Sequence, residues 1–178
     1  MTRVFTAVDI EDQQVLDELE YIRNTLNMNF NPVSRRKMHI TLEFFKHLEN
    51  SEIEQLRRHI LNAELESFEA ELKGVGAFPS KEYIRVVWAG VESDNFHQLQ
   101  KYVSSHDLES DNSHEFKPHV TLFRVEDLSR KKKRKLMKGL EDHESHGFGK
   151  IEVNSVKIFE SRLNEEGSDY RILEEIEF

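Results

Sequence analysis

Apolar residues recur along the chain with two different periods, which divide it into predicted strands and helices. Alternation at every second residue is typical of a half-buried strand, and spacings of three and four are typical of an amphipathic helix. We expect strands at residues 4–9, 38–45, 68–75, 84–91, 119–125, 151–159 and 170–178. We expect helices at residues 11–27, 51–65, 94–107 and 129–140.

Local signals set some of the boundaries of these elements. Ser51, with Glu54 three residues later, predicts a capping box at the start of the second helix. Gly74, Gly76 and Pro79 are expected to break the third strand. The elements then follow the order β-α-β-α-β and β-α-β-α-β-β, and no change of composition marks a linker. We therefore predict a single domain over residues 1–178, of the α+β or α/β class, made of two similar halves.

The two predicted halves share a short motif inside a strand. Residues 39–42 read His-Ile-Thr-Leu, and residues 119–122 read His-Val-Thr-Leu. Because side chains alternate along a strand, the His and Thr of each copy share one face and the two aliphatic residues share the other. If the halves pack about a pseudo-twofold axis, the two His-Thr pairs face each other across a cleft.

Two imidazoles and two hydroxyls in this arrangement suit acid–base chemistry on a tetrahedral phosphate. A neutral histidine can take a proton from water while a protonated one gives a proton to the leaving oxygen, and both titrate near neutral pH. Threonine hydroxyls can donate hydrogen bonds to the non-bridging phosphate oxygens. His39 and His119 are therefore candidate catalytic residues, and Thr41 and Thr121 are candidate phosphate ligands. This chemistry requires no metal and no cofactor.

The charge of the chain is unevenly distributed. The formal net charge of the 178 residues is −9. Residues 129–138 hold seven cations and no anion, so the remainder carries −16. This segment is expected to be a helix whose cations face either solvent or a nucleic acid. The acidic net charge therefore does not exclude a polyanionic partner.

Composition excludes several other classes. Leu, Ile, Val and Phe make up 52 of the 178 residues, well above the ~20% at which disorder becomes the default. The absence of cysteine excludes disulfides, thiolate metal sites and a cysteine nucleophile. No apolar run approaches the roughly 18 residues of a membrane span, and Asp9 interrupts the first segment, so we expect neither a membrane anchor nor a signal peptide. A cytoplasmic monomer is the simplest prediction.

The motifs and their surroundings resemble the two-histidine (2H) phosphoesterases. They resemble more closely the RNA 2′,3′-cyclic phosphodiesterases of bacteria and archaea, also called LigT-like or 2′-5′ RNA ligase-like proteins. The resemblance covers nearly the whole chain. Besides both motifs it includes residues 3–9, 76–80, 85–91 and 161–163, and Arg124, which matches an arginine that the family usually has after its second motif.

The resemblance implies an α+β fold of two pseudo-symmetric lobes, with antiparallel sheets facing a central groove and helices outside. The implied activity is hydrolysis of an RNA terminal 2′,3′-cyclic phosphate to the 2′-phosphomonoester, on RNA ends or on nucleoside 2′,3′-cyclic phosphates. By family analogy His39 donates a proton and His119 accepts one, an assignment that two near-identical motifs do not decide. Thr41, Thr121 and Arg124 are then the phosphate-binding residues.

Departures from the family pattern lie beside the first motif. Lys46 stands where the family usually has glycine, and residues 34–37 replace a Pro-Glu-Asn type of turn. Arg35 and Arg36 are candidate RNA contacts, with a solvated turn as the alternative. Of the two phenylalanines after the motif, one is expected in the core, and Phe45 is the candidate to stack on a base, although core packing of both is the simpler alternative.

Two other functions remain open on the sequence alone. A non-catalytic module that binds nucleotides or RNA would use the same groove without turnover. Reversible 2′–5′ ligation of RNA ends would run the reverse chemistry at the same site. The intact histidine pair favours the hydrolase, because binding alone requires cations more than a titrating pair.

Overall fold

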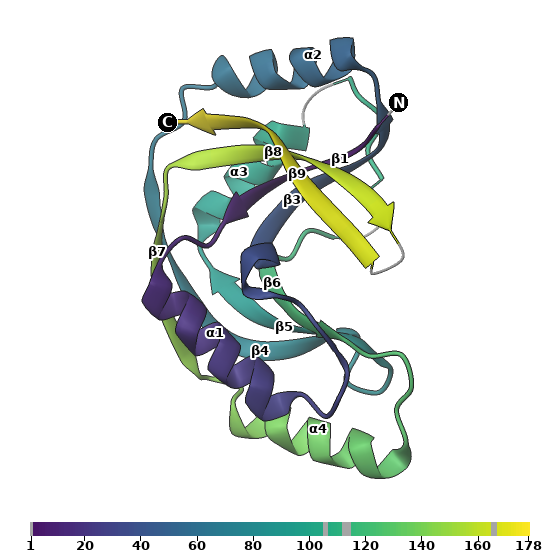
Figure 1. Ribbon diagram of the computed structural model, residues 1–178. Helices are drawn as coiled ribbons and strands as arrows, with labels where there is room; N and C mark the ends of the chain where they lie inside the picture. The colour runs from purple at the N-terminus through teal and green to yellow at the C-terminus, as the bar shows by residue number, and fades with distance from the viewer. Residues whose placement is uncertain (1, 105–106, 112–114, 165–166) are drawn as a thin grey trace.

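The computed structural model describes residues 2–104, 107–111, 115–164 and 167–178, and most of these lie in strands and helices (Figure 1). The strands are β1 (Thr2–Asp9), β2 (Asn31–Pro32), β3 (His39–Leu48), β4 (Phe68–Pro79), β5 (Ile84–Glu92), β6 (His119–Arg124), β7 (Gly147–Val153), β8 (Ser155–Asn164) and β9 (Gly167–Glu177). The helices are α1 (Gln13–Leu26), α2 (Asn50–Leu61), α3 (Asp94–Ser104) and α4 (Arg130–Asp142), with a short 3-10 helix at Arg35–Lys37.

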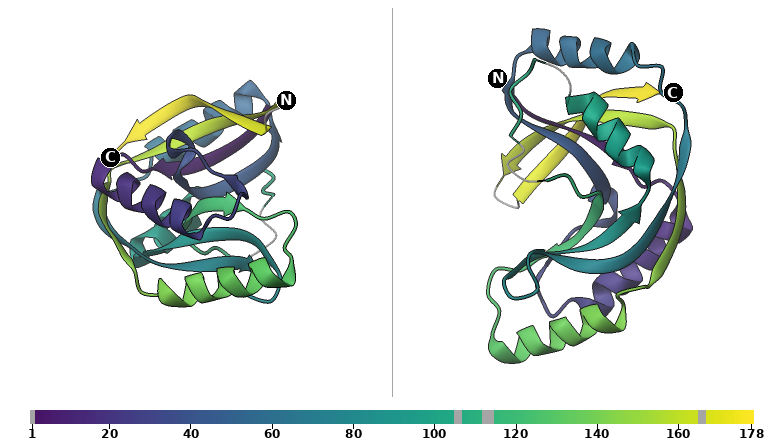
Figure 2. Two further views of the ribbon diagram at one scale, coloured as in Figure 1. Left: turned by 60° about the horizontal axis from the view of Figure 1, so that its bottom comes forward. Right: turned by 180° about the vertical axis from the view of Figure 1, so that it is seen from behind.

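The strands form one antiparallel sheet in the order β7-β4-β5-β6-β3-β1-β8-β9, with β2 paired to β6 beside this path. The sheet curls, so that β7, β4, β5 and β6 form a lower arm, and β3, β1, β8 and β9 form an upper arm (Figures 1 and 2). The arms meet where β3 pairs with β6 through a single registered pair, Ile40 opposite Val120. The α+β class is thus confirmed, and the two sheets that the resemblance implied are the two arms of this sheet.

Helices α1 and α3 each follow a strand of one arm and pack against the other arm. α1 follows β1 of the upper arm but packs against β6 and β7 of the lower arm, next to α4. α3 follows β5 of the lower arm but packs against β3 of the upper arm, next to α2. Because each arm is covered by a helix that comes from the other, this exchange holds the arms together across their narrow seam.

The amphipathic pattern predicts the buried face of each helix well. α1 buries Leu16, Leu19 and Ile22, and α3 buries Phe96 and Leu99. Some helix bounds differ from the prediction: α1 begins at residue 13 in place of 11, and α2 ends at residue 61 in place of 65. Helix α2 begins at residue 50, one residue earlier than predicted, and its capping box therefore uses Glu49 and Glu52 in place of Ser51 and Glu54.

Two strand predictions also need correction. β4 does not break at its glycines but continues to Pro79, because Gly74 takes up a positive φ of 72° where the pairing with β5 shifts register. The single strand predicted at 151–159 is two strands, β7 and β8, which are separated at Asn154. The predicted helix 94–107 ends at Ser104 in the described residues, and positions 105–106 lie outside them.

Long apolar helices are missing from the part of the chain that the structure describes. None of its helices has the length and apolar character needed to cross a membrane.

Candidate active site

The two His-Thr motifs meet at the seam between the arms. Because β3 and β6 are antiparallel and Ile40 lies opposite Val120, the register places His39 across from Thr121 and Thr41 across from His119. Ile40 and Val120 are fully buried. The four motif residues are partly exposed and share the other face of the sheet. The fold thus gathers two imidazoles and two hydroxyls into one cluster, with each histidine facing the threonine of the other motif.

A bulge follows each motif. On β3, Thr41 pairs with Ala7, but the next registered pair is Glu43 with Thr6, so one residue is inserted. On β6 the same shift separates Thr121 from the next registered residue, Phe123. A bulge places an extra residue in one strand and changes which side chains face outward after it. The two motif strands therefore share their irregularity as well as their sequence.

The bulges bring one more residue of each strand to the motif face. Beyond them, Phe44 on β3 and Arg124 on β6 are exposed at equivalent positions. Burial lowers the pKa of both His39 and His119, and the positive charge of Arg124 adds a smaller lowering to each. At these equivalent positions the lower arm presents a cation and the upper arm an aromatic ring.

Phe45 is not available for base stacking. Its side chain is 0% exposed, whereas Phe44 is 39% exposed and lines the groove. The choice of Phe45 was wrong because strict alternation from His39 puts residue 45 on the motif face, and the bulge reverses this order. Of the two, Phe44 is therefore the one that a ligand in the groove can reach.

His39 rests against aromatic rings of the upper arm. Its ring centroid lies 5.1 Å from that of Phe5, 5.5 Å from that of Tyr170 and 6.1 Å from that of Phe159. Burial lowers the pKa of His39 to about 4, and a hydrogen bond to the backbone of Lys37 opposes this shift. In the free protein the imidazole is thus neutral at neutral pH and is fixed in position by its surroundings.

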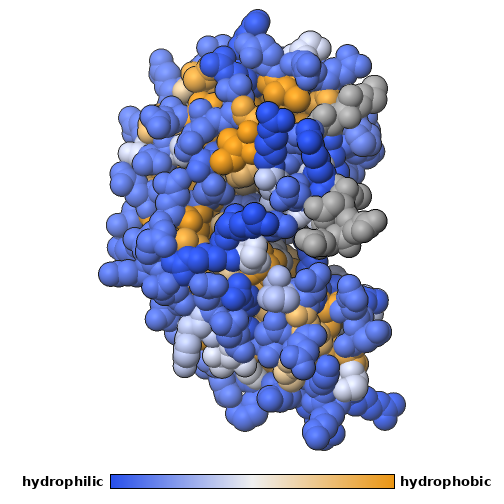
Figure 3. Space-filling view, viewed as in Figure 1, coloured by the Kyte–Doolittle hydropathy of each residue, from blue (hydrophilic) through white to orange (hydrophobic). Residues whose placement is uncertain are grey.

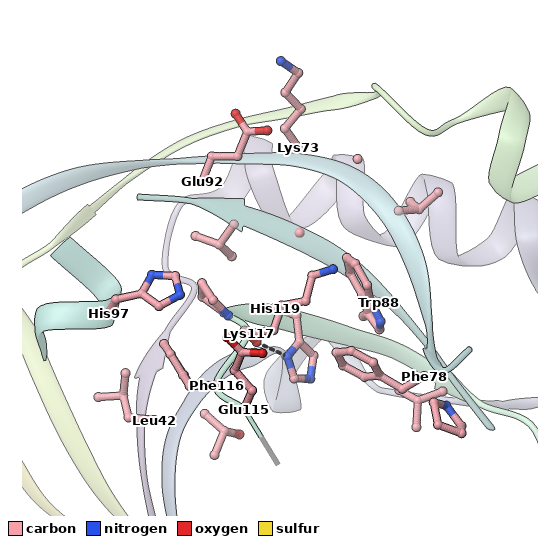
Figure 4. A pocket seen from close by; sticks show the side chains of 18 of the residues that line it. Leu42, Lys73, Phe78, Trp88, Glu92, His97, Glu115, Phe116, Lys117 and His119 are labelled. Carbon is pink, nitrogen blue, oxygen red and sulfur yellow. Dashed lines mark hydrogen bonds between the residues drawn. The ribbon is translucent and has the colours of Figure 1, made fainter. Parts of the chain in front are cut away.

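His119 has an equivalent setting on the lower arm. Its ring contacts Phe78 edge to face at 4.9 Å and lies 6.2 Å from Trp88 (Figure 4). Its Nδ1 is 2.7 Å from the carbonyl oxygen of Lys117. Since a carbonyl only accepts, Nδ1 carries the hydrogen and Nε2 carries the lone pair of the neutral ring. Burial lowers the pKa of His119, and the charges of Lys117 and Arg124 lower it further.

A lysine precedes each histidine by two residues, a feature that the predictions from sequence did not include. Lys117 Nζ lies 4.3 Å from the centroid of the Trp88 ring. Lys37 Nζ lies 5.6 Å from the centroid of the Tyr170 ring and donates a 2.6 Å hydrogen bond to the carbonyl oxygen of Ser168. In each arm, one aromatic ring therefore contacts both the lysine and the histidine. The signal was present in the sequence, because the shared motif extends backward to Lys-x-His-x-Thr-Leu.

The two arginines predicted to contact RNA, Arg35 and Arg36, have different surroundings in the structure. Arg35 donates to Asp17 at 2.5 Å and to Glu20 at 2.8 Å, and it also bonds Gln13. Hydrogen bonds to Glu20 and then to Asp17 raise the pKa of Arg35. Its guanidinium thus binds the surface of α1 and is not directed at a phosphate, whereas Arg36 is exposed to solvent.

A groove of about 1250 Å³ runs between the arms beside the motifs, and the space-filling view is hollowed at this place (Figure 3). Thr41 and Phe44 line it from the upper arm, and it is lined from the lower arm by residues that include Phe78, Trp88 and His119. Trp88 keeps its place because β4 has Gly76 there, where a Cβ would stand 2.2 Å from the indole ring. Among the described residues, no group of three or more His, Cys, Asp or Glu is placed to hold a metal ion.

Comparison with known proteins agrees with this arrangement. The family described as the AKAP7 2′5′ RNA ligase-like domain matches residues 4–178. An RNA 2′,3′-cyclic phosphodiesterase of Methanothermobacter thermautotrophicus is 32% identical over 182 residues, covering 97% of this chain and 96% of the relative. One of Methanocaldococcus jannaschii is 27% identical over 176 residues, covering 97% and 99%.

Solved structures share the fold. The crystal structure of TT0787 of Thermus thermophilus has a TM-score of 0.79 at 24% identity, covering 98% of this chain and 97% of that one. The structure of E. coli LigT complexed with 3′-AMP has a TM-score of 0.78 at 19% identity, covering 99% and 97%. The curled sheet and the paired motifs define the class as a two-histidine phosphoesterase. Within this class the chain belongs to the AKAP7 2′5′ RNA ligase-like domain family.

Proposed function

We propose that this protein hydrolyses RNA terminal 2′,3′-cyclic phosphates to 2′-phosphomonoesters by acid–base catalysis between His119 and His39, without a metal ion. The observation that carries the proposal is the seam, where two imidazoles, two threonines and Arg124 share one face of the sheet. The relatives named RNA 2′,3′-cyclic phosphodiesterase support the choice of substrate. In this proposal the threonines and Arg124 bind and orient the phosphate, and the histidines transfer the protons, so the reaction needs no further group.

In the proposed reaction, His119 Nε2 removes a proton from a water molecule as its oxygen attacks phosphorus. The bond between phosphorus and the 3′-oxygen breaks in line with this attack, and His39 gives its proton to the leaving oxygen. The product keeps the phosphate on the 2′-oxygen. His119 ends protonated and His39 ends neutral, and exchange with solvent restores the starting state. Thr41 and Thr121 hold the non-bridging oxygens, and Arg124 balances the charge that develops on them.

The depressed pKa values place a condition on this mechanism. Burial holds the pKa of His39 at about 4 and lowers that of His119, so both rings are mostly neutral in the free protein at pH 7. A cyclic phosphate bound between the two rings adds a negative charge, and a negative charge next to an imidazole raises its pKa because it stabilises the protonated form. The substrate is thus expected to bind together with the proton that His39 later donates.

This condition predicts two different pH profiles. The value of kcat/KM reports the free enzyme, so it should fall as pH rises through neutrality, by about tenfold per unit once both histidines are neutral. The value of kcat reports the complex, in which the phosphate raises both pKa values, so its decline should begin at higher pH. Both are measured on a nucleoside 2′,3′-cyclic phosphate. Coincident profiles, or a flat kcat/KM from about pH 5 to 8, would contradict proton uptake with the substrate.

Product analysis tests the proposed function directly. A nucleoside 2′,3′-cyclic phosphate incubated with the protein and a chelator should give the 2′-phosphate, which phosphorus NMR distinguishes from the 3′-phosphate. A 3′-phosphate product would mean that the other oxygen leaves. Binding without turnover would favour a non-catalytic module, and activity that a chelator removes and zinc restores would exclude the two-histidine mechanism.

A further inference from the structure

Helix α4 carries a row of cations that the proposed reaction does not use. Arg130 and Arg134 are four residues apart, as are Lys131 and Lys135, so each pair lies on one face of the helix. All four are exposed, and Leu136 and Leu140 on the other face are buried in the core. We call these four residues the basic stripe.

Among the described residues, no hydrogen bond or ion pair involves a side chain of the stripe, in contrast to neighbouring cations on the same helix. Lys138 pairs with Asp142 at 3.0 Å, and Lys132 and Lys133 donate to the carbonyl oxygens of Met28 and Glu82. Within the described ranges of the chain, none of the four stripe residues lies within 4 Å of a carboxylate. Contacts within the fold therefore satisfy these other cations of α4, and no described carboxylate pairs with the stripe.

The stripe also works against the stability of its own helix. The first turn of a helix is the positive end of its dipole and favours acidic residues, and like charges four residues apart repel. α2 and α3 follow this rule with Glu52 and Asp94, whereas α1 and α4 have no acidic residue in the first turn, and α4 places cations there instead. An arrangement that costs folding stability and gains no internal contact indicates a polyanion outside the protein.

The stripe begins near the groove. Arg130 follows Arg124 by six residues, a distance of at most ~20 Å along the chain. Lys133 bonds the β4–β5 hairpin at Glu82, and Pro79 and Arg85, on either side of this hairpin, line the groove. Figures 1 and 2 show the hairpin beside the start of α4 at the open edge of the lower arm.

We propose that the basic stripe binds the body of a single-stranded RNA whose cyclic end occupies the seam between the arms. This inference rests on the proposed function, since it takes the end of the RNA as the substrate. Phosphates behind the reacting one would pass the hairpin and lie along the outer face of α4. An RNA fits better than a membrane, because α4 uses its apolar face inside the protein and has none to insert into lipid.

The test compares two substrates and two matched variants. The substrates are a nucleoside 2′,3′-cyclic phosphate and an RNA of roughly ten nucleotides with a cyclic end, which exceeds the ~20 Å span at about 3.4 Å per stacked nucleotide. The stripe variant combines Lys131→Glu with Arg134→Glu. The control combines Arg58→Glu on α2 with Lys101→Glu on α3. Both residues are exposed, both helices pack on the upper arm, and the net charge changes by the same amount as in the stripe variant.

The stripe variant is expected to raise KM for the long RNA about tenfold or more at low salt, and to lower the slope of log KM against log salt by about 1.4, or 0.7 for each lost phosphate contact. Its kinetics on the mononucleotide should stay unchanged, and its melting temperature should not fall, because a like-charge repulsion is removed. An unchanged KM for the long RNA, or an equal effect in the control, overturns the proposal.

A second measurement separates this inference from the proposed function. Fluorescence anisotropy of the same RNA with an ordinary 3′-phosphate reports binding without turnover, and the stripe variant should bind it more weakly than the control does. If the wild-type protein fails to hydrolyse the mononucleotide, the proposed function fails, and anisotropy still decides whether the stripe binds RNA. Equal RNA binding by both variants, with stripe-dependent binding of vesicles rich in phosphatidylserine, assigns the stripe to a membrane surface and overturns the RNA proposal.

Discussion

Replacing His119 with alanine is expected to lower kcat on a 2′,3′-cyclic phosphate by about 10²–10⁴, the usual contribution of one positioned acid or base. His39→Ala should cause a loss of the same order, because in the proposed reaction each ring performs one of two proton transfers in the same step. The double variant should cost less than the product of the two single losses, since the two rings act as one unit. Each effect is measured as single-turnover hydrolysis of a mononucleotide under saturating protein.

Controls distinguish chemistry from folding in this experiment. His97 lies on α3 and lines the same groove, so His97→Ala removes an imidazole near the substrate without touching the motif pair. This variant should keep kcat within a few-fold of wild type. The circular dichroism spectrum and melting curve of each variant show whether the fold persists. Near wild-type turnover by either motif variant would rule out the paired mechanism.

The repeated motif was predictable because it rests on a local rule. Alternation along a strand places His39 and Thr41 on one face from the sequence alone, and their partial exposure in the structure agrees with it. Unbroken alternation would also put Glu43 on this face, two residues later. Instead this carboxylate is 1% exposed and accepts hydrogen bonds from Ser104 and Ser110, 61 and 67 residues away.

The bulge beside Glu43 could not be inferred because its determinants are not local. The inserted residue is defined by the partner strand β1, whose register against β3 shifts there. The sequence of β3 alone is compatible with unbroken alternation, which selects Phe45 in place of Phe44. Similarly, Arg35 appears as free charge next to the motif, and only the packing of α1 reveals that Asp17 and Glu20 bind it.

The aromatic rings behind the histidines illustrate the same limit. Phe5, Phe159 and Tyr170 lie on β1, β8 and β9, and they meet His39 only because the upper arm places these strands in order beside β3. Their effect is chemical as well as structural, since the burial that they provide belongs to the environment that lowers the pKa of His39. The strand pattern predicts apolar positions, but the pairing order decides which of them shape the site.

A substrate with sulfur in place of the 3′-oxygen is expected to reveal which histidine is the acid. A thiol has a pKa near 8.5, so a thiolate leaves without a proton, whereas an alkoxide requires one. The loss caused by His39→Ala, about 10²–10⁴ on the normal substrate, should therefore shrink to about tenfold or less on the sulfur substrate. The loss caused by His119→Ala should persist, because the attacking water still needs a base.

The comparison uses the ratio of wild-type to variant rates on each substrate, so that any general effect of the longer bond to sulfur cancels. Rescue of His119→Ala in place of His39→Ala would exchange the two roles and make the ring that hydrogen-bonds Lys117 the proton donor. Rescue of neither variant would mean that leaving-group protonation does not limit the reaction, and that both histidines act by holding the phosphate. The two rings have near-identical settings, each with a lysine two residues before it and an aromatic ring beside it. Because these settings do not distinguish the acid from the base, the sulfur substrate is needed to assign the two roles.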